Sequence, residues 1–364
     1  MKKYLLLLFL LMSFVPTFKA EAADYTLKNG KTQTGTYAGE GEDVYNYYKV
    51  TPSKDGYMAI TAKTSDKSLL VVDICDANKD IVASDISIAH KKTVLHKIEK
   101  KKVYYIRIKG TQDVTYNISY KMNTFETLSY AKKYTYTFTN ASFKNKSKSI
   151  LLKIKSSISG NLNFMCKTEN PITVQYLNNK KKVISGNITM KKNSLSGIGV
   201  KADKVYYVRL WNPENTISGT TTISNMKYQI NSVSPTSYSS RGNSYTLSYN
   251  KYKESLVPAD GKSTHWYKVK LTKDQKLSVY VESRMLQMKG SFLKLDLYNR
   301  DGKRITSNSI VISDEAYATY KQGKYKMNYP VKSITTGKLP SDTYYIRIIS
   351  SSKKTSGSFR IKWN

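Results

Sequence analysis

Hydrophobic and polar residues alternate along one short segment that the sequence contains three times. The copies cover residues 103–108, 205–210 and 343–348 and read VYYIRI, VYYVRL and TYYIRI. Successive side chains of a β-strand point to opposite faces, so each copy presents two stripes. Arginine rarely enters a core without a partner, which assigns its stripe to the outer face. Each copy is therefore predicted to be a half-buried strand of one repeated β domain.

This alternation predicts which side chains of the repeated strand face the core. The expected buried residues are Tyr104, Ile106, Ile108, Tyr206, Val208, Leu210, Tyr344, Ile346 and Ile348. The residues between them are expected to be exposed: Tyr105, Arg107, Tyr207, Arg209, Tyr345 and Arg347.

The remainder of the chain predicts an all-β fold. Short runs rich in Val, Ile, Thr and Tyr alternate with turn signals roughly every 8 to 12 residues, and no long run has helical spacing. This pattern indicates tandem antiparallel β-sandwich (jelly-roll-like) domains. The length of 364 residues suits three such domains, which we place at 23–121, 122–232 and 233–364, with the second the most degenerate.

The first residues predict export. Two lysines precede an apolar run from Tyr4 to Val15, interrupted only by Ser13, and Ala20 and Ala22 provide a small-x-small cleavage site. These features predict a signal peptide over residues 1–22. No cysteine follows the run, which excludes a lipoprotein signal, and no second apolar run indicates a transmembrane segment. We expect a secreted, extracellular protein and leave open its association with the cell surface.

Residues with catalytic chemistry are sparse. Cys75 and Cys166 lie in apolar strands of different repeats, so free buried thiols are expected. His90, His96 and His265 lack helical ligand spacing, and the last two are expected at the surface or at strand edges. No nucleophile elbow, zinc-protease helix or phosphate-binding glycine loop is present. We expect no enzymatic activity and no cofactor.

One turn invites comparison with a calcium loop. Asp76, Asn78 and Asp80 have the alternating spacing of such a loop, and Asp73 precedes them. The sixth position is Ile81 where the loop requires Gly, and no Glu occupies the twelfth. A hairpin turn rich in Asp and Asn explains the cluster as well, so we expect no metal site here.

Three short motifs of the third repeat carry a resemblance to a known family. They are the segment 337–348, the aromatic-Lys-Val strand at 266–269 and the hairpin at 295–305. With them, the repeats resemble the bacterial pre-peptidase C-terminal domain, end to end in the first and third repeats and loosely in the second. The resemblance implies a jelly-roll-like sandwich and a role in substrate or polysaccharide binding, sometimes with calcium. No protease domain accompanies the repeats, unlike the usual members.

The formal net charge of +34 favours polyanionic partners such as acidic polysaccharides and cell-wall polymers. The lysines are spread over all three repeats, so a solvated lysine-rich surface is the alternative explanation. No feature indicates specific nucleic-acid binding.

The outward stripes supply the candidate ligand-binding residues. They are Trp266, Lys268, Tyr345 and Arg347 in the third repeat and Tyr105 and Arg107 in the first. Aromatic rings can stack on sugars, while Arg and Lys bind carboxylates or phosphates. The alternative is a purely structural cross-strand ladder in which the arginine covers the tyrosine ring.

An insertion at 313–337 in the third repeat adds Tyr320 and Tyr325 to the candidates. A long loop in a compact domain often has a function. The alternative is an extra edge hairpin packed by its own tyrosines.

Together these features predict a non-catalytic binding protein for an anionic polysaccharide or cell-wall polymer. The alternatives are a structural, spacer or adhesion protein of the cell surface, which could contact other surface proteins, and an accessory module for a secreted hydrolase. A cryptic hydrolase is the remaining alternative.

Overall fold

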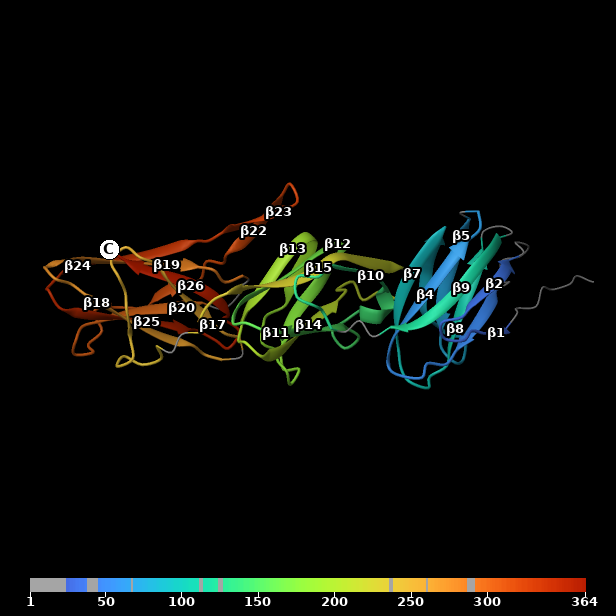
Figure 1. Ribbon diagram of the computed structural model, residues 1–364, viewed down its shortest axis with the longest axis horizontal. Coiled ribbons are helices and arrows are strands. Elements are labelled where there is room, and N and C mark those ends of the chain that lie inside the picture. The colour runs from blue at the N-terminus through green and yellow to red at the C-terminus, as the bar shows by residue number, and fades with distance from the viewer. Residues whose placement is uncertain are drawn as a thin grey trace, which may run out of the picture. The chain divides into compact units, whose positions relative to one another are not determined.

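The computed structural model describes residues 24–37, 45–66, 68–110, 114–123, 127–235, 238–259, 261–286 and 292–364. The predicted signal peptide over residues 1–22 lies outside them. Apart from one 3-10 turn, η1 (Asn140–Phe143), every regular element within these ranges is a strand, which confirms the all-β prediction (Figure 1). Over the same ranges, no helix is long and apolar enough to span a membrane.

The chain divides into two compact units. Unit 1 comprises Met1–Thr93 and Ile98–Met122, and unit 2 comprises Val94–Lys97 and Asn123–Asn364. We name the strand sets β1–β9, β10–β15 and β16–β26 repeats 1, 2 and 3. The three predicted domain ranges stay predictions, since repeats 2 and 3 share one compact unit.

Repeat 1 consists of two sheets. The first has the order β1 (Asp24–Thr26), β3 (Asn46–Val50), β8 (Tyr104–Gly110), β5 (Leu69–Cys75), β6 (Ile81–Ala89). The second has the order β7 (Lys91–Ile98), β4 (Gly56–Thr64), β9 (Val114–Asn123), β2 (Thr32–Tyr37). The repeated sequence motif forms β8, the central strand of the first sheet. β1 runs parallel to β3, whereas the pairs β3–β8, β8–β5 and β5–β6 are antiparallel.

Repeat 3 has the same strand order. Its first sheet is β16 (Tyr245–Thr246), β18 (Thr264–Lys270), β25 (Thr343–Ser350), β20 (Leu293–Tyr298), β21 (Ile310–Ile312). Its second sheet is β17 (Lys253–Val257), β26 (Gly357–Trp363), β19 (Gln275–Ser283), β24 (Val331–Leu339). The short β16 is again parallel to its neighbour, and the repeated motif is again the central strand, β25.

Repeat 2 merges strands that are separate in the other repeats. Its strands are β10 (Tyr134–Thr139), β11 (Ile150–Ser156), β12 (Gly160–Leu177), β13 (Ile188–Val200), β14 (Lys204–Trp211) and β15 (Thr220–Ser232). The first half of β12 pairs with β15 and the second half pairs with β14. A shift in register between Thr168 and Ile172 separates the two halves. β12 therefore changes its partner along its length, from β15 before the register shift to β14 after it.

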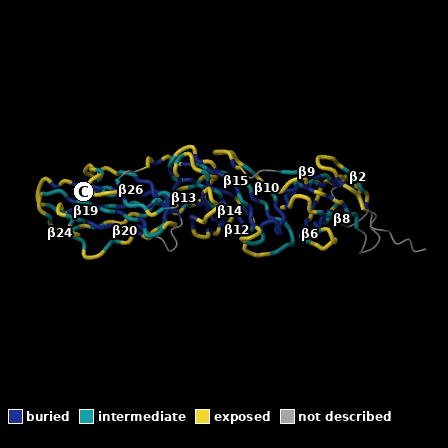
Figure 2. The backbone as a smooth tube through the Cα atoms, turned by 90° about the horizontal axis from the view of Figure 1, so that it is seen from below, coloured by how far each residue is buried: buried dark blue, intermediate teal, exposed yellow. Residues whose placement is uncertain are grey.

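The predicted phase of the repeated strand is confirmed. All nine side chains expected to face the core are buried; Ile106, Val208 and Ile346, for example, are 0% exposed. Figure 2 shows the corresponding alternation of buried and more exposed positions along the strands. The tyrosines and arginines between them were expected to be exposed, and this is wrong in degree: they are half-buried. Side chains from neighbouring strands and turns contact them, as described below.

Both cysteines are free and buried, as predicted. The histidine prediction is wrong, because His96 and His265 are buried rather than at the surface. The ring of His265 packs edge-on against Phe359 with centroids 5.3 Å apart, and Nδ1 of His96 lies 2.9 Å from Oγ1 of Thr139. Burial lowers the pKa of His96 to about 3 and that of His265 to about 4.

Candidate functional site

The outward side of the repeated strand, which is β8, β14 or β25, has the same cross-strand ladder in every repeat. The central arginine lies opposite Asp73 in repeat 1, Gln175 in repeat 2 and Asp296 in repeat 3. The central tyrosine lies opposite Lys49, Lys153 and Lys268 in the same order. Directly opposed side chains on one face are close enough to interact. The ladder therefore fixes the surroundings of each predicted ligand-binding residue.

In repeat 3, Arg347 is ion-paired with a buried acid. Its Nη2 and Nε donate to one carboxylate oxygen of Asp296 at 2.8 and 3.3 Å, and Ser309 Oγ donates to the other oxygen at 2.6 Å. Asp296 is only 1% exposed. Desolvation would raise the pKa of this carboxyl group, but the hydrogen bonds from Ser309 and Arg347 outweigh it and lower the pKa. The positive charge of Arg347 is thus largely compensated by the carboxylate of Asp296.

Two aromatic rings cover this ion pair. The guanidinium carbon of Arg347 lies 5.5 Å from the ring centre of Trp266 and 5.1 Å from that of Tyr298. The two rings are 5.2 Å apart and tilted by 43°. Lys268 lies beside them and makes no ion pair with a described residue. Trp266, Lys268, Tyr345 and Arg347 are thus brought together on one face, as the sequence predicts.

Repeat 1 has the same arrangement around Arg107. Its Nη2 and Nε donate to Asp73 at 2.6 and 3.0 Å, and its guanidinium carbon lies 4.2 Å from the ring centre of Tyr45. Tyr105 packs edge-on against Tyr47 at 6.2 Å. Tyr105 and Arg107 therefore also belong to an aromatic and cationic face.

Repeat 2 retains the geometry without the acid. Nη1 of Arg209 donates to Oε1 of Gln175 at 3.1 Å. Position 151, opposite the arginine on the other side, is Leu where repeats 1 and 3 have Tyr47 and Trp266. The aromatic part of the face is therefore absent from this strand of repeat 2.

Sequence reasoning missed the acids that hold the arginines. The sequence pattern indicates no role for Asp296, and it places Asp73 only as the residue that precedes the Asp-rich turn. The available signal was a carboxylate inside the apolar strand runs 69–74 and 293–298, since such a group needs a partner. The partner itself depends on strand order, which the sequence does not reveal directly.

The Asp-rich turn of repeat 1 is explained by backbone hydrogen bonds. A carboxylate oxygen of Asp76 accepts the N–H groups of Asn78 and Asp80 at 2.9 and 3.0 Å. In repeat 2, Asn178 forms the same turn through its amide oxygen. An amide serves as well as a carboxylate, so turn formation accounts for the residue type. Within the described ranges, no group of three or more His, Cys, Asp or Glu residues could hold a metal.

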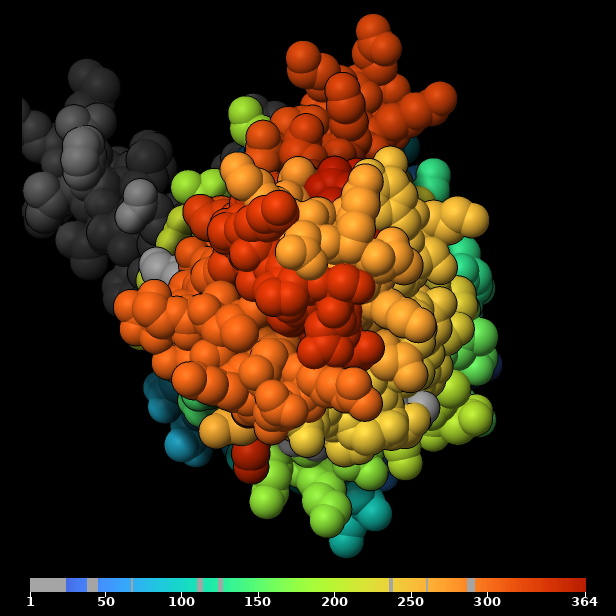
Figure 3. Space-filling view, turned by 90° about the vertical axis from the view of Figure 1, so that its left-hand side faces the viewer, coloured from blue at the N-terminus to red at the C-terminus, as the bar shows by residue number. Residues whose placement is uncertain are grey.

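The insertion forms a separate hairpin. β22 (Tyr317–Lys321) and β23 (Lys324–Asn328) pair only with each other, and the rings of Tyr320 and Tyr325 are 4.9 Å apart. Figure 1 shows the hairpin on the side of β19 and β24, the opposite sheet from β18 and β25. Figure 3 shows atoms of the same colour range projecting at the top. The structure does not place Tyr320 and Tyr325 on the face that contains Trp266.

The hairpin contacts repeat 2 through Tyr325. The hydroxyl group donates to the carbonyl oxygen of Ser194 in β13 at 3.2 Å. Burial raises the pKa of Tyr325 to about 12. Tyr320, by contrast, is 42% exposed. Tyr325 therefore has an observed structural role, which the sequence did not suggest.

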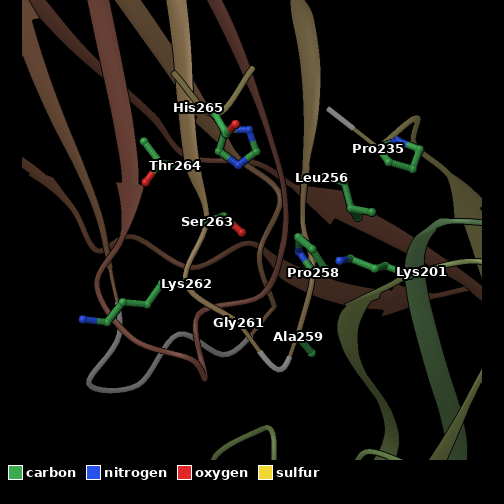
Figure 4. A pocket seen from close by; sticks show the side chains of 11 residues that line it. Lys201, Pro235, Leu256, Pro258, Ala259, Gly261, Lys262, Ser263, Thr264 and His265 are labelled. Carbon is green, nitrogen blue, oxygen red and sulfur yellow. The ribbon is translucent and has the colours of Figure 1, made fainter. Parts of the chain in front are cut away.

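A cavity of about 340 Å³ lies between repeats 2 and 3 (Figure 4). Lys201 lines it from repeat 2, whereas Ser263, Thr264 and His265 line it from repeat 3, and the side chain of Lys262 points away. His265 has a pKa lowered to about 4, so it is neutral at pH 7. None of the described lining residues is Asp, Glu or Cys. Among the described residues that line the cavity there is therefore no carboxylate or thiol to pair with His265.

Comparison with protein-family models and with curated proteins gives no match. Among solved structures, tripeptidyl peptidase 2 is 8% identical, with 94% of this chain and 32% of that chain covered and a TM-score of 0.23. This chain thus spans about a third of that peptidase. A triple jelly-roll protein of an archaeal virus turret is 10% identical over 92% of this chain and 90% of that chain, with a TM-score of 0.27.

A tandem CBM22 domain of Xyn10C from Paenibacillus barcinonensis is 9% identical over 58% of this chain and 80% of that chain, with a TM-score of 0.17. At these TM-scores none of the similarities supports an argument about function. The functional argument therefore depends on the residues of this chain.

Proposed function

We propose that this protein is a non-catalytic, secreted or cell-surface binding protein for an anionic polysaccharide or cell-wall polymer. The outward face of the first sheet of repeat 3 is the proposed binding surface. The carrying observation is that Trp266, Tyr298 and Lys268 share one flat sheet face in a chain of net charge +34. The proposal includes the relationship to pre-peptidase C-terminal domains that the sequence motifs indicate.

The physical roles within this face differ. Arg347 is neutralised by Asp296, so its contribution is to hold the rings of Trp266 and Tyr298 in place. The rings offer apolar surface on which a sugar can stack. Lys268 and the general positive field attract the acidic groups of the polymer. Stacking should give selectivity for sugars, and charge should give affinity that falls with salt.

The test is binding of the full chain to polygalacturonate and to neutral dextran at low and high salt. We expect binding to polygalacturonate that weakens with salt, without release of products. Trp266→Ala should weaken binding by about fivefold, because stacking of this size contributes about 1 kcal/mol. Tyr280→Ala, a half-buried tyrosine of the opposite sheet, is the matched control.

Three results would overturn the proposal. No binding to any acidic polymer would favour the spacer function. Equal and salt-insensitive binding to both polysaccharides would remove the electrostatic contribution. Release of products would show a hydrolase.

A further inference from the structure

A five-residue turn recurs beside the central tyrosine of each repeat. It covers residues 76–80 in repeat 1, 178–182 in repeat 2 and 299–303 in repeat 3. Within the turn, the N–H of the first residue donates to the carbonyl oxygen of the fifth, at 2.9 Å in all three repeats, and the N–H of the fourth donates to that of the first. The fourth residue has a positive φ: 66° at Lys79, 57° at Lys181 and 86° at Gly302. The same backbone conformation thus recurs at the fourth residue of the turn in each repeat.

In repeats 1 and 2 this fourth residue places an ammonium group over the central tyrosine. Nζ of Lys79 lies 5.3 Å from the ring centre of Tyr105, and Nζ of Lys181 lies 5.8 Å from that of Tyr207. Such contacts stabilise a cation without cancelling its charge. Arg107 and Arg347 differ in this respect, because Asp73 and Asp296 neutralise their charges.

Repeat 3 supplies the cation by a different route. Its fourth residue is Gly302, and a Cβ atom there would lie 2.2 Å from Nη1 of Arg241. Arg241, which precedes β16, therefore occupies the space of the missing side chain, with its guanidinium carbon 5.6 Å from the ring centre of Tyr345. All three repeats thus hold a cation over the same tyrosine, although the residue that provides it differs.

Repeat 1 shows what this cation binds. Both carboxylate oxygens of Asp24 lie 3.0 Å from Nζ of Lys79. Asp24 directly precedes Tyr25, which pairs with Tyr48, and in repeat 3 the equivalent Tyr245 pairs with Tyr267.

The residue before Tyr245 is Ser244, so repeat 3 lacks this carboxylate. Among the described residues, Arg241 makes no ion pair. The cation position is therefore filled by the chain itself in repeat 1 and open in repeat 3.

We propose that Arg241, held over Tyr345, is the subsite of repeat 3 for a carboxylate of an acidic polysaccharide, and that Asp24 fills the equivalent subsite of repeat 1. This inference rests on the proposed function and deepens it by naming the acidic group. Asp24 is a carboxylate, so a uronic acid is a better match than a phosphate. Lys268, opposite Tyr345 in the neighbouring strand, adds a second positive charge to the subsite.

The decisive variant is Ser244→Asp, tested in the full chain on polygalacturonate. The new carboxylate should occupy the subsite and weaken binding about threefold, as expected for one exposed ion pair. Ser248→Asp makes the same change in charge at an exposed serine nearby and should have a smaller effect.

Arg241→Gln should match the loss in Ser244→Asp, whereas Arg241→Lys should retain binding, because repeat 1 uses lysine at this position. Lys273→Gln removes one charge from an exposed lysine of the same repeat and is the matched control. Asp24→Ser should open the subsite of repeat 1 and strengthen binding to the polymer.

The outcomes separate this inference from the proposed function. If Trp266→Ala weakens binding but Ser244→Asp and Arg241→Gln bind like their controls, the subsite is wrong and the binding function stands. If the unmodified chain binds no acidic polymer, both fail. If Arg241→Gln weakens binding to poly(glycerol phosphate) but not to polygalacturonate, the assignment to a carboxylate is wrong.

Discussion

Repeats 1 and 3 share their strand order and their ladder but differ at the edge of the face. Both hold the central arginine with a buried aspartate, Asp73 or Asp296. In repeat 1, the cation over the tyrosine is bound by the chain's own Asp24, whereas Ser244 leaves it open in repeat 3. The two repeats therefore share the buried ion pair and differ in whether the chain itself supplies a carboxylate to the cation over the central tyrosine.

Repeat 2 supports this division. Gln175 replaces the aspartate and still accepts a hydrogen bond from Arg209 at 3.1 Å. Repeat 2 thus keeps the hydrogen bond between the strands. It lacks the negative charge of the aspartate, and Leu151 replaces the aromatic residue on the other side of the arginine. The arginine of the motif is thus primarily a structural residue, which shifts the expected ligand contacts to the cations and rings around it.

The largest effect is expected from the shared core. Ile346→Asp places a charge at a position that is 0% exposed and should destabilise the fold by about 4 kcal/mol or more. Tyr345→Ser, at the next residue on the outward face, should lower the free energy of unfolding by only about 1 kcal/mol. Chemical denaturation of the full chain measures both. The reverse ranking would contradict the assignment of core and face.

The sequence was sufficient to predict which residues of the repeated strands are buried. It was insufficient to predict the partners of the residues on the outward face. The phase of the three central strands was predictable because arginine excludes one of the two faces. Cys75 and Cys166 were predictable because each lies in an apolar run. In both cases burial could be predicted from the pattern of a few consecutive residues.

The remaining features depend on contacts between distant segments. Asp296 meets Arg347 because β20 lies beside β25, and Arg241 lies over Tyr345 in the space that a side chain at position 302 would enter. His265 is buried by Phe359 from the other sheet of the same repeat. Neither propensity nor alternation within a strand specifies such partners.

A smaller effect is expected from the ion pair that repeats 1 and 3 share. Asp296→Asn keeps a hydrogen-bond acceptor, as in repeat 2, but removes the charge, and should cost about 1 to 2 kcal/mol at pH 7. Asp314→Asn is the control, since that carboxylate is half-exposed and lies 3.7 Å from Lys332. Its loss should cost less than about 0.5 kcal/mol.

The cost of Asp296→Asn should depend on pH. The pKa of Asp296 is lowered in the folded state, so its contribution is complete above the unfolded pKa of about 3.9 and is lost as the pH falls through the lower folded value. The difference in stability between the two proteins should therefore shrink below about pH 4. Denaturation at pH 7, 4 and 2.5 measures it. A difference that is constant over this range would contradict the ionised pair.

The smallest effect is expected at the hairpin, the other feature that repeat 1 lacks. Tyr325→Phe removes the hydroxyl group that donates to the carbonyl oxygen of Ser194 at 3.2 Å and leaves the ring against Tyr320. One such hydrogen bond contributes about 0.5 to 1.5 kcal/mol, and the 3.2 Å distance favours the lower part of this range.

Tyr320→Phe provides the control, since Tyr320 is 42% exposed and its hydroxyl group can be solvated. Equilibrium denaturation of both variants should show a loss for Tyr325→Phe alone. Because Ser194 belongs to repeat 2, such a loss would indicate that the hairpin stabilises the pairing of repeats 2 and 3. An equal or larger loss for Tyr320→Phe would instead place the stabilising role within the hairpin itself.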